Sequence, residues 1–536
     1  MAGTVTPAAT TTATTAATTS ATTPVAGRGG VPRVAVVAAA GVAVLALLPV
    51  AVVTVEALRA DPAATAGFLL RPRVGELLTN TLALVVLSGT ACLVVGTGAA
   101  WLVERTTLPG RGLWRVLLVA PLAVPAFVNS YAWVSLRPGT DGLGAAVLVT
   151  TLSYVPFVVL PVGAALRGLD PALEDSARAL GLGRTAVLVR VVLPQLRFAA
   201  LGGLLLVTLH LLAEFGALEL IRFPTFTVAI LEQYDTSFTG ATAQTLAVVL
   251  VVLCLALLAA EGRARGGARY SRLGPGSRRR PDAVPLGRWT LPALAAVGGL
   301  VALALGVPVA ALVRWLGAAP DAFSENGSGT GGLLAATVTT AGLGAAAAAL
   351  TLAAAFPVAW LVTHRRDRVA ALVERATYVA SALPGVVVAL ALVALTVHRA
   401  PVLYQSAALL VVAYAVLFLP RAVVSLRAAL AQAPPELADA ARALGCGPWQ
   451  AARRVLLPLA APGAVAGAAL VFVATATELT ATLLLAPTGT RTLATGFWAA
   501  SDSLDYAAAA PYALVMVALS APMAWLLLRT PGEGAR

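Results

Sequence analysis

Lysine is absent from the sequence, and arginine supplies all 37 of its basic residues. A chain without lysine cannot contain a nucleotide-binding loop of the G-x-x-x-x-G-K-[ST] type, because the lysine of that loop contacts the β- and γ-phosphates. If ATP drives this protein, the hydrolysis must therefore take place on a partner chain.

Charged residues are also scarce: they make up 11% of the 536 residues, against 59% for hydrophobic residues. Soluble domains usually carry about 25% charged residues. The charges stand between apolar runs longer than about 18 residues, a pattern typical of a polytopic α-helical membrane protein. The alternative, a soluble protein with a very large core, does not account for so many runs of spanning length.

Cysteine and histidine are rare and scattered, with three of each. Cys92, Cys254 and Cys446 lie far apart, so no disulfide framework is predicted. The histidines show no metal-ligand spacing, and we expect no metal site and no intramembrane enzyme chemistry.

The apolar runs predict an all-α protein with about twelve membrane spans. Before the first span, residues 1–30 form an Ala/Thr-rich tail without charge over its first 26 residues; we expect it to be disordered, and not a signal peptide. The spans are expected to begin near Val34, Leu77, Leu113, Leu143, Phe198, Ala241, Trp289, Leu333, Leu372, Val402, Ala461 and Ala510.

The arginines test this topology, because basic residues concentrate in cytoplasmic loops. With the N-terminus inside, most arginines fall in cytoplasmic segments. Residues 263–288 alone hold eight arginines and a single acid, Asp282, and are rich in glycine and proline. We interpret this stretch as a basic cytoplasmic linker and not as a nucleic-acid-binding segment.

The two sides of the linker repeat one another. Ala100-Trp101-Leu102-Val103 recurs as Ala359-Trp360-Leu361-Val362, and Ala177-Arg178-Ala179-Leu180-Gly181 recurs as Ala441-Arg442-Ala443-Leu444-Gly445. The repeats predict two tandem six-span units, residues 31–262 and 289–530. An even number of spans gives both units one orientation, with a pathway expected where they meet.

A short amphipathic helix is predicted in one cytoplasmic loop of each unit. Asp170 and Pro171 suit a helix start and Gly181 suits a left-handed end; in the second unit Pro435 and Gly445 repeat this. Such a helix can seat on a soluble partner as a lever, or it can lie on the membrane surface. The spacing alone leaves both readings open.

The same loops resemble the "EAA" loop of binding-protein-dependent ABC importer permeases: Glu-Ala-Ala, three residues, Gly, and later Leu-Pro. Here Asp replaces Glu in both copies, and Leu193-Pro194 and Leu457-Pro458 close the pattern. The resemblance covers about residues 30 to 530 and implies coupling loops at 166–197 and 428–460. The residues expected to dock on an ATPase subunit are Asp175, Ser176, Ala177, Arg178, Gly181, Asp439, Ala440, Ala441, Arg442 and Gly445.

The resemblance further implies the type I ABC importer fold and a set of partners. These are two copies of a cytoplasmic ATPase subunit, which would hold ATP and Mg²⁺, an extracytoplasmic solute-binding protein and the lipid bilayer. This chain itself would bind no cofactor. It would lie in the bacterial cytoplasmic membrane with both termini inside. A gradient-driven secondary transporter also suits two parallel halves, but it gives no reason for the paired loops.

A narrower similarity concerns the cargo. The segment Glu478–Gly489 and the following Thr492–Thr495, together with Glu214–Ala217 and Pro121–Phe127, look like ferric-iron importer permeases. The similarity favours ferric iron, with thiamine, polyamines, sulfate and molybdate as alternatives.

The predicted pathway residues are polar groups and prolines inside spans. Glu214 and Glu478 either line the pathway and attract a cation or pair with helix-end donors and fix the shape of a gate. The other candidates are Asn129 and Tyr131, and Pro125 and Pro384, which are expected to kink their helices.

Overall fold

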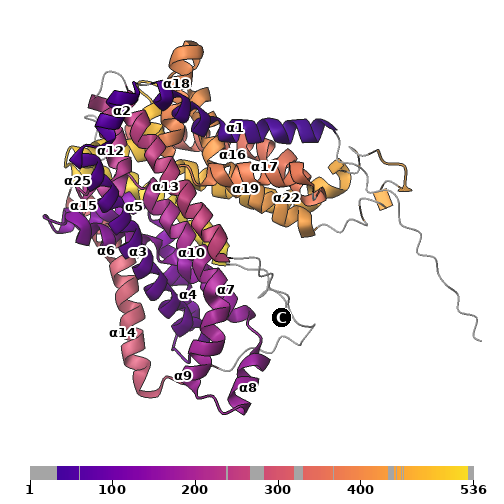
Figure 1. The fold of residues 1–536 in the computed structure, drawn as a ribbon. Helices are drawn as coiled ribbons and strands as arrows, with labels where there is room; N and C mark the ends of the chain where they lie inside the picture. The colour runs from indigo at the N-terminus through magenta and orange to yellow at the C-terminus, as the bar shows by residue number, and fades with distance from the viewer. Residues whose placement is uncertain are drawn as a thin grey trace, which may run out of the picture.

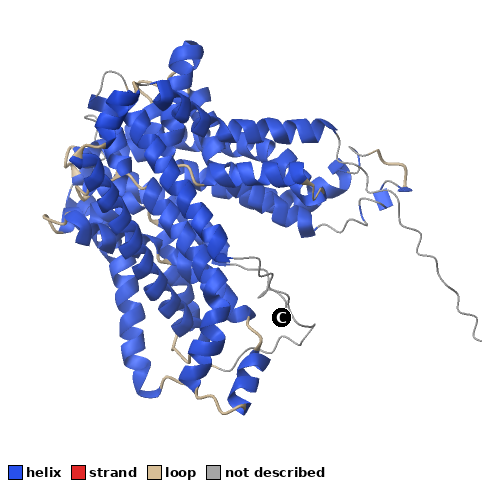
Figure 2. Ribbon diagram, in the orientation of Figure 1, coloured by secondary structure: helices blue, strands red, loops and turns tan. Residues whose placement is uncertain are grey.

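The computed structural model describes the chain except residues 1–32, 60, 237–239, 266–282, 319–329, 366, 433–436, 438–439, 442, 448–449, 451 and 529–536. The predicted N-terminal tail, most of the predicted linker, and Asp439 and Arg442 therefore lie outside the described residues. Almost all of the described part that is regular is helix (Figure 2). Its one β-bridge joins Thr106 to Val284.

The first unit and the second are built from the same kinds of helix, drawn in Figure 1. The helices of the first unit are α1 (Arg33–Arg59), α2 (Pro62–Leu69), α3 (Pro72–Arg105), α4 (Arg111–Val119), α5 (Ala126–Leu136), α6 (Gly142–Tyr154), α7 (Pro156–Gly168), α8 (Pro171–Ala179), α9 (Arg184–Val187), α10 (Leu193–Ala213), α11 (Gly216–Leu220), α12 (Phe226–Thr236) and α13 (Ala241–Arg265), with η1 (Ala120–Ala123) and the π-helical η2 (Leu188–Val192) between them.

The second unit repeats this order in its described residues. Its elements are η3 (Gly287–Trp289), α14 (Thr290–Val301), η4 (Ala302–Gly306), α15 (Val307–Ala318), α16 (Thr330–His364), α17 (Arg368–Ser381), α18 (Gly385–Arg399), η6 (Pro401–Leu403), α19 (Ala407–Gln432), η7 (Ala452–Leu456), α22 (Leu457–Ala476), α23 (Thr480–Leu485), α24 (Leu493–Asp502) and α25 (Tyr506–Leu528).

Eight of these segments are long and apolar enough to cross a membrane, and three bent helix pairs bring the number to as many as 11. A shorter apolar helix, Tyr506–Pro522, comes last. Each predicted span start falls in or close to one of these segments. The prediction of an all-α membrane protein is confirmed.

The structure corrects the expected kinks at Pro125 and Pro384. These prolines do not bend continuous helices; each is the residue before a new helix, α5 or α18. The helices on either side meet at 91° for α4–α5 and 103° for α17–α18. A residue before proline is disfavoured in the helical conformation, and Val124 is accordingly extended, with φ −101° and ψ 113°.

The two units exchange their first helices. α1 packs on α16, α17 and α18 of the second unit, whereas α15 packs on α5 and α14 contacts α4 of the first. Figure 1 shows α1 along the second-unit bundle and α14 along the first-unit bundle, and the two bundles diverge away from their junction. Because each unit covers part of the other, neither half is complete alone.

Glycine brings together the two helices that flank each predicted coupling segment. A Cβ at Gly203 of α10 would lie 2.8 Å from the carbonyl oxygen of Phe157 in α7. A Cβ at Gly463 of α22 would lie 2.3 Å from Cβ of Ala429 in α19. Both pairs therefore need glycine for their close backbone approach.

Candidate functional site: two coupling segments and a central junction

The first coupling segment forms the short helix that the sequence predicts. Asp170 caps α8, its carboxylate accepting a hydrogen bond from the Ala172 N–H at 3.0 Å, and Pro171 opens the helix. Gly181 follows the helix with φ +85°. The Leu182 N–H donates to the Ala177 carbonyl at 3.1 Å, which closes the helix end.

The predicted apolar face of α8 is only partly covered. Ala177 is buried, whereas Leu173 and Leu180 are 46% and 84% exposed. The second segment repeats this: Ala441 is buried, and Leu437 and Leu444 are 43% and 86% exposed. Large exposed apolar side chains beside a buried small one provide a surface on which another protein can pack.

The remaining described residues of the second segment show the same helix end. Gly445 has φ +88°, and the Cys446 N–H donates to the Ala441 carbonyl at 3.0 Å. Ala440 is exposed. In the first segment Asp175 and Arg178 form a solvent-facing ion pair at 3.3 Å, and the Ser176 hydroxyl donates to the Ala172 carbonyl at 2.7 Å.

Buried charges at the C-terminal end of α3 were missed by the sequence reasoning. The Arg105 guanidinium donates to Glu174 of α8, and both side chains are almost fully buried. Glu104, the preceding residue, accepts hydrogen bonds from Arg115 of α4 at 2.8 Å and from Arg167 of α7. Four helices thus meet on two adjacent carboxylate–arginine clusters.

Glu214 stands at the junction of the two units, between α10 and α11. Its Oε1 accepts a hydrogen bond from the Ala217 N–H at 2.9 Å, and its Oε2 accepts one from the Tyr154 hydroxyl. Its main-chain carbonyl accepts from the Thr227 hydroxyl at 2.6 Å. Both carboxylate oxygens are therefore engaged by donors of the same unit.

Glu478 occupies the matching place between α22 and α23. Its Oε1 accepts from the Ala481 N–H at 2.9 Å, as Glu214 does from Ala217. A Cβ at Gly385, the first residue of α18, would lie 2.8 Å from that same oxygen. Each carboxylate thus contacts a helix N-terminus, where backbone N–H groups stabilise negative charge. The pairing with helix-end donors is therefore observed, whereas the role of the glutamates in a pathway or a gate stays a prediction.

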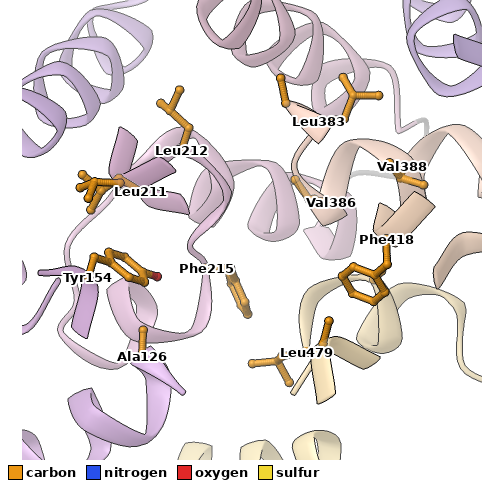
Figure 3. Packing of buried hydrophobic residues seen from close by; sticks show 14 of the residues in the cluster. Ala126, Tyr154, Leu211, Leu212, Phe215, Leu383, Val386, Val388, Phe418 and Leu479 are labelled. Atoms are coloured by element: carbon orange, nitrogen blue, oxygen red, sulfur yellow. The ribbon is translucent and has the colours of Figure 1, made fainter. Parts of the chain in front are cut away.

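Buried hydrophobic side chains of both units come together at the junction (Figure 3). Tyr154 and Phe215 of the first unit face Phe418 and Leu479 of the second across the junction. A Cβ at Gly216 would lie 2.8 Å from Cδ2 of Leu479, so the loops carrying the two glutamates touch.

The other predicted pathway residues are packed inside the protein. The Asn129 amide donates to the Ser153 hydroxyl at 2.9 Å and the Tyr131 hydroxyl donates to the Tyr506 carbonyl at 2.5 Å. Tyr131 also packs edge-on against Phe497, with ring centroids 5.3 Å apart. Tyr131 therefore fastens α5 to α24 and α25 of the other unit.

Arg421 is a further charged residue at the junction that the sequence reasoning passed over. It lies inside the apolar helix α19, with its guanidinium 5.0 Å from the centroid of the Phe418 ring. In the described part of the chain it forms no salt bridge and no side-chain hydrogen bond. An arginine in the middle of the run from Leu417 to Val424 was the available signal.

The described residues contain no group of three or more His, Cys, Asp or Glu side chains that could hold a metal ion. A duplicated helical membrane protein, with broken helices meeting at the centre and short helices with exposed leucines, belongs to the class of transporter permeases.

The comparisons with known proteins then give the family. Residues 92–262 and 352–529 each match the family described as binding-protein-dependent transport system inner membrane component, and this chain belongs to that family. It is therefore a multi-pass permease subunit of an ABC importer and not an enzyme, and it works with an ATPase and a solute-binding protein.

Individual relatives differ in how much of the chain they match. The Fe(3+)-transport system permease protein FbpB 2 of Haemophilus influenzae is 34% identical over 90% of this chain and 95% of its own length. The spermidine/putrescine permease PotB of Escherichia coli is 26% identical over 35% of this chain and 78% of its own. A molybdenum transport permease, ModB of Escherichia coli, is 31% identical over 23% of this chain and 62% of its own.

Proposed function

We propose that this chain forms the pathway through which ferric iron crosses the bacterial cytoplasmic membrane, handed over by an extracytoplasmic binding protein and driven by ATP hydrolysis on partner subunits. The main support for the proposal is the similarity to the Fe(3+)-transport system permease of Haemophilus influenzae, which extends over nearly the whole of both chains. The polyamine and molybdenum relatives match only 35% and 23% of this chain.

The two coupling segments support a drive by two ATPase subunits. They present the same exposed leucines, the same buried alanine and the same left-handed glycine, one set in each unit. One identical ATPase subunit could therefore seat on each. In this proposal Asp175, Ser176, Arg178, Asp439 and their neighbours in the EAA pattern contact the ATPases, which hold the ATP and Mg²⁺. Both termini then lie in the cytoplasm.

The pathway lies at the junction, between the loops of Glu214 and Glu478. The carboxylates hold helix N-termini in place, so they shape the passage and are not assigned as tight ligands of the ion. This suits transport, because an ion handed from one protein to another must also leave.

The test is reconstitution of the complete transporter, with its ATPase and binding protein, in proteoliposomes. We expect ATP-dependent accumulation of radioactive ferric iron, and none when the ATPase is inactivated. Thiamine, spermidine, sulfate and molybdate, offered in parallel, should not accumulate.

Two results would refute the proposal in different ways. Accumulation of thiamine or molybdate in place of iron would leave the importer intact and replace its cargo. Accumulation against a gradient without the ATPase subunits would overturn the role of the coupling segments.

A further inference from the structure

A buried ion pair ties the first coupling helix to the longest helix of its unit. Glu174, in the first turn of α8, and Arg105, the last residue of α3, are each 5% exposed. Arg105 Nη2 donates to Glu174 Oε1, while Arg178 Nη2 lies 3.4 Å from Glu174 Oε2. Arg105 Nη1 is buried and has no hydrogen-bond partner among the described residues. Glu174 is thus the only carboxylate that Arg105 contacts in the described part of the chain.

The end of the linker meets the chain at the same point. The Val284 N–H donates to the Arg105 carbonyl at 2.8 Å, and the Thr107 N–H donates to the Val284 carbonyl at 3.1 Å. The Leu286 N–H lies 3.3 Å from the Thr107 hydroxyl. The last residue of α3 therefore joins the first coupling helix to the segment that enters the second unit.

The second unit cannot form this pair. When the two units are aligned so that Ala100 matches Ala359, His364 stands at the position of Arg105. When the coupling segments are aligned so that Ala177 matches Ala441, Ala438 stands at the position of Glu174. The His364 ring stacks on Trp360, with centroids 4.4 Å apart. Neither residue of this matched pair is a carboxylate.

A buried ion pair transmits force in a way that an exposed one does not. Separating it leaves a charge without its partner in a low-dielectric surrounding, which is strongly unfavourable. When an ATPase displaces α8, Glu174 must therefore carry Arg105 and the end of α3 with it. An alanine at the matching position provides no such link.

We infer that Arg105 and Glu174 are positioning residues that make α8 a rigid lever on α3, so that the two coupling helices contribute unequally to transport. The inference rests on the proposed docking of ATPase subunits on these helices. It does not depend on which cargo is carried.

The experiment uses the complete transporter in proteoliposomes and measures cargo moved per ATP hydrolysed. Glu174→Gln keeps the shape of the side chain and removes its charge. We expect the ratio to fall about tenfold or more while ATP hydrolysis continues. Glu76→Gln is the matched control, since Glu76 lies near the other end of α3 and pairs with Arg73 in solvent at 3.1 Å; its ratio should not change.

A second variant separates force transmission from folding. In Arg105→Glu/Glu174→Arg the pair is restored with its charges exchanged. We expect the ratio to rise above that of Glu174→Gln and to stay below that of the wild type, because Arg178, which lies 3.4 Å from Glu174 Oε2, would then face a second arginine. A Glu174→Gln ratio equal to that of Glu76→Gln would overturn the inference, and so would a charge-exchanged variant no better coupled than Glu174→Gln.

The cargo used in the assay is the ligand that the co-purified binding protein retains. If that ligand is not ferric iron, the proposed function changes, but the ratio can still be measured and the inference still judged.

Discussion

In both units an arginine that precedes the coupling segment pairs with a carboxylate, but the two carboxylates come from different helices. In the first unit Glu104 of α3 joins α4 and α7 through Arg115 and Arg167. In the second, Glu374 of α17 pairs directly with Arg427 of α19.

The sequence relates these contacts. When Ala100 is aligned with Ala359, Glu374 stands at the position of Arg115 and Thr363 at the position of Glu104. Further along the chain, Leu166-Arg167 recurs as Leu426-Arg427. The arginine before each coupling segment has kept a carboxylate partner, although that partner comes from a different helix. Duplication therefore preserved the contact between helices and not the residue that makes it.

The largest effect on uptake is expected at the left-handed glycine that both units have at the end of the coupling helix. Gly181→Val and Gly445→Val together force β-branched residues into the left-handed conformation, at about 1–2 kcal/mol or more for each site. A Cβ meets nothing within 4 Å at either position, so backbone strain is the sole cause. We predict normal membrane insertion, continued ATP hydrolysis and uptake reduced more than about tenfold.

The control for this variant is the pair Gly181→Asn and Gly445→Asn, because asparagine tolerates the left-handed region. It should retain most of the uptake. Normal transport by the valine variant would show that the two helix ends are not levers.

The next largest effect on uptake is expected at Arg421, a charged residue that only the second unit has at the junction. Arg421 has no arginine counterpart in residues 160–163 of the first unit. Arg421→Met removes the charge and keeps a long side chain, so we predict uptake altered about three- to tenfold, with ATP hydrolysis still dependent on the binding protein. Uptake equal to the wild type would mean that Arg421 does not face the pathway.

Glu104 and Glu374, the two carboxylates compared above, should differ in their effect on stability. The Glu104 side chain is 5% exposed and has two arginine partners, whereas that of Glu374 is 27% exposed and has one. We predict that Glu104→Gln lowers the free energy of unfolding by about 2 kcal/mol and Glu374→Gln by less than about 1 kcal/mol. Thermal unfolding in detergent measures both, and equal losses would contradict the comparison.

The smallest predicted effect concerns the residue that follows each broken-helix proline, Ala126 in the first unit and Gly385 in the second. A Cβ at Gly385 would crowd the flexible end of Glu478, which can move aside by a few tenths of an ångström. We predict that Gly385→Ala lowers uptake about two- to threefold, while Ala126→Gly has no effect beyond a slight loss of stability. If Gly385→Ala lost all uptake, the Glu478 carboxylate would have to be held far more rigidly than its one described hydrogen bond, from the Ala481 N–H, implies.

Much of this protein can be predicted from its sequence, because a bilayer limits the possible structures. A run of apolar residues must satisfy its own backbone hydrogen bonds, so it becomes a helix wherever it lies. The span starts, the duplication and the capped helix from Pro171 to Ala179 depend on such local rules, and the structure has them where the sequence predicts them. Membership of the importer family rests on the same local motifs.

Other features were decided only by tertiary structure. Pro125 and Pro384 indicate a disturbance, but the right-angle breaks depend on what packs against each side. The exchange of first helices, the contact of the Glu214 and Glu478 loops, and the burial of Arg105 against Glu174 join residues far apart in the chain. No periodicity encodes such pairs, because whether a charge is solvated or buried depends on which distant helix covers it.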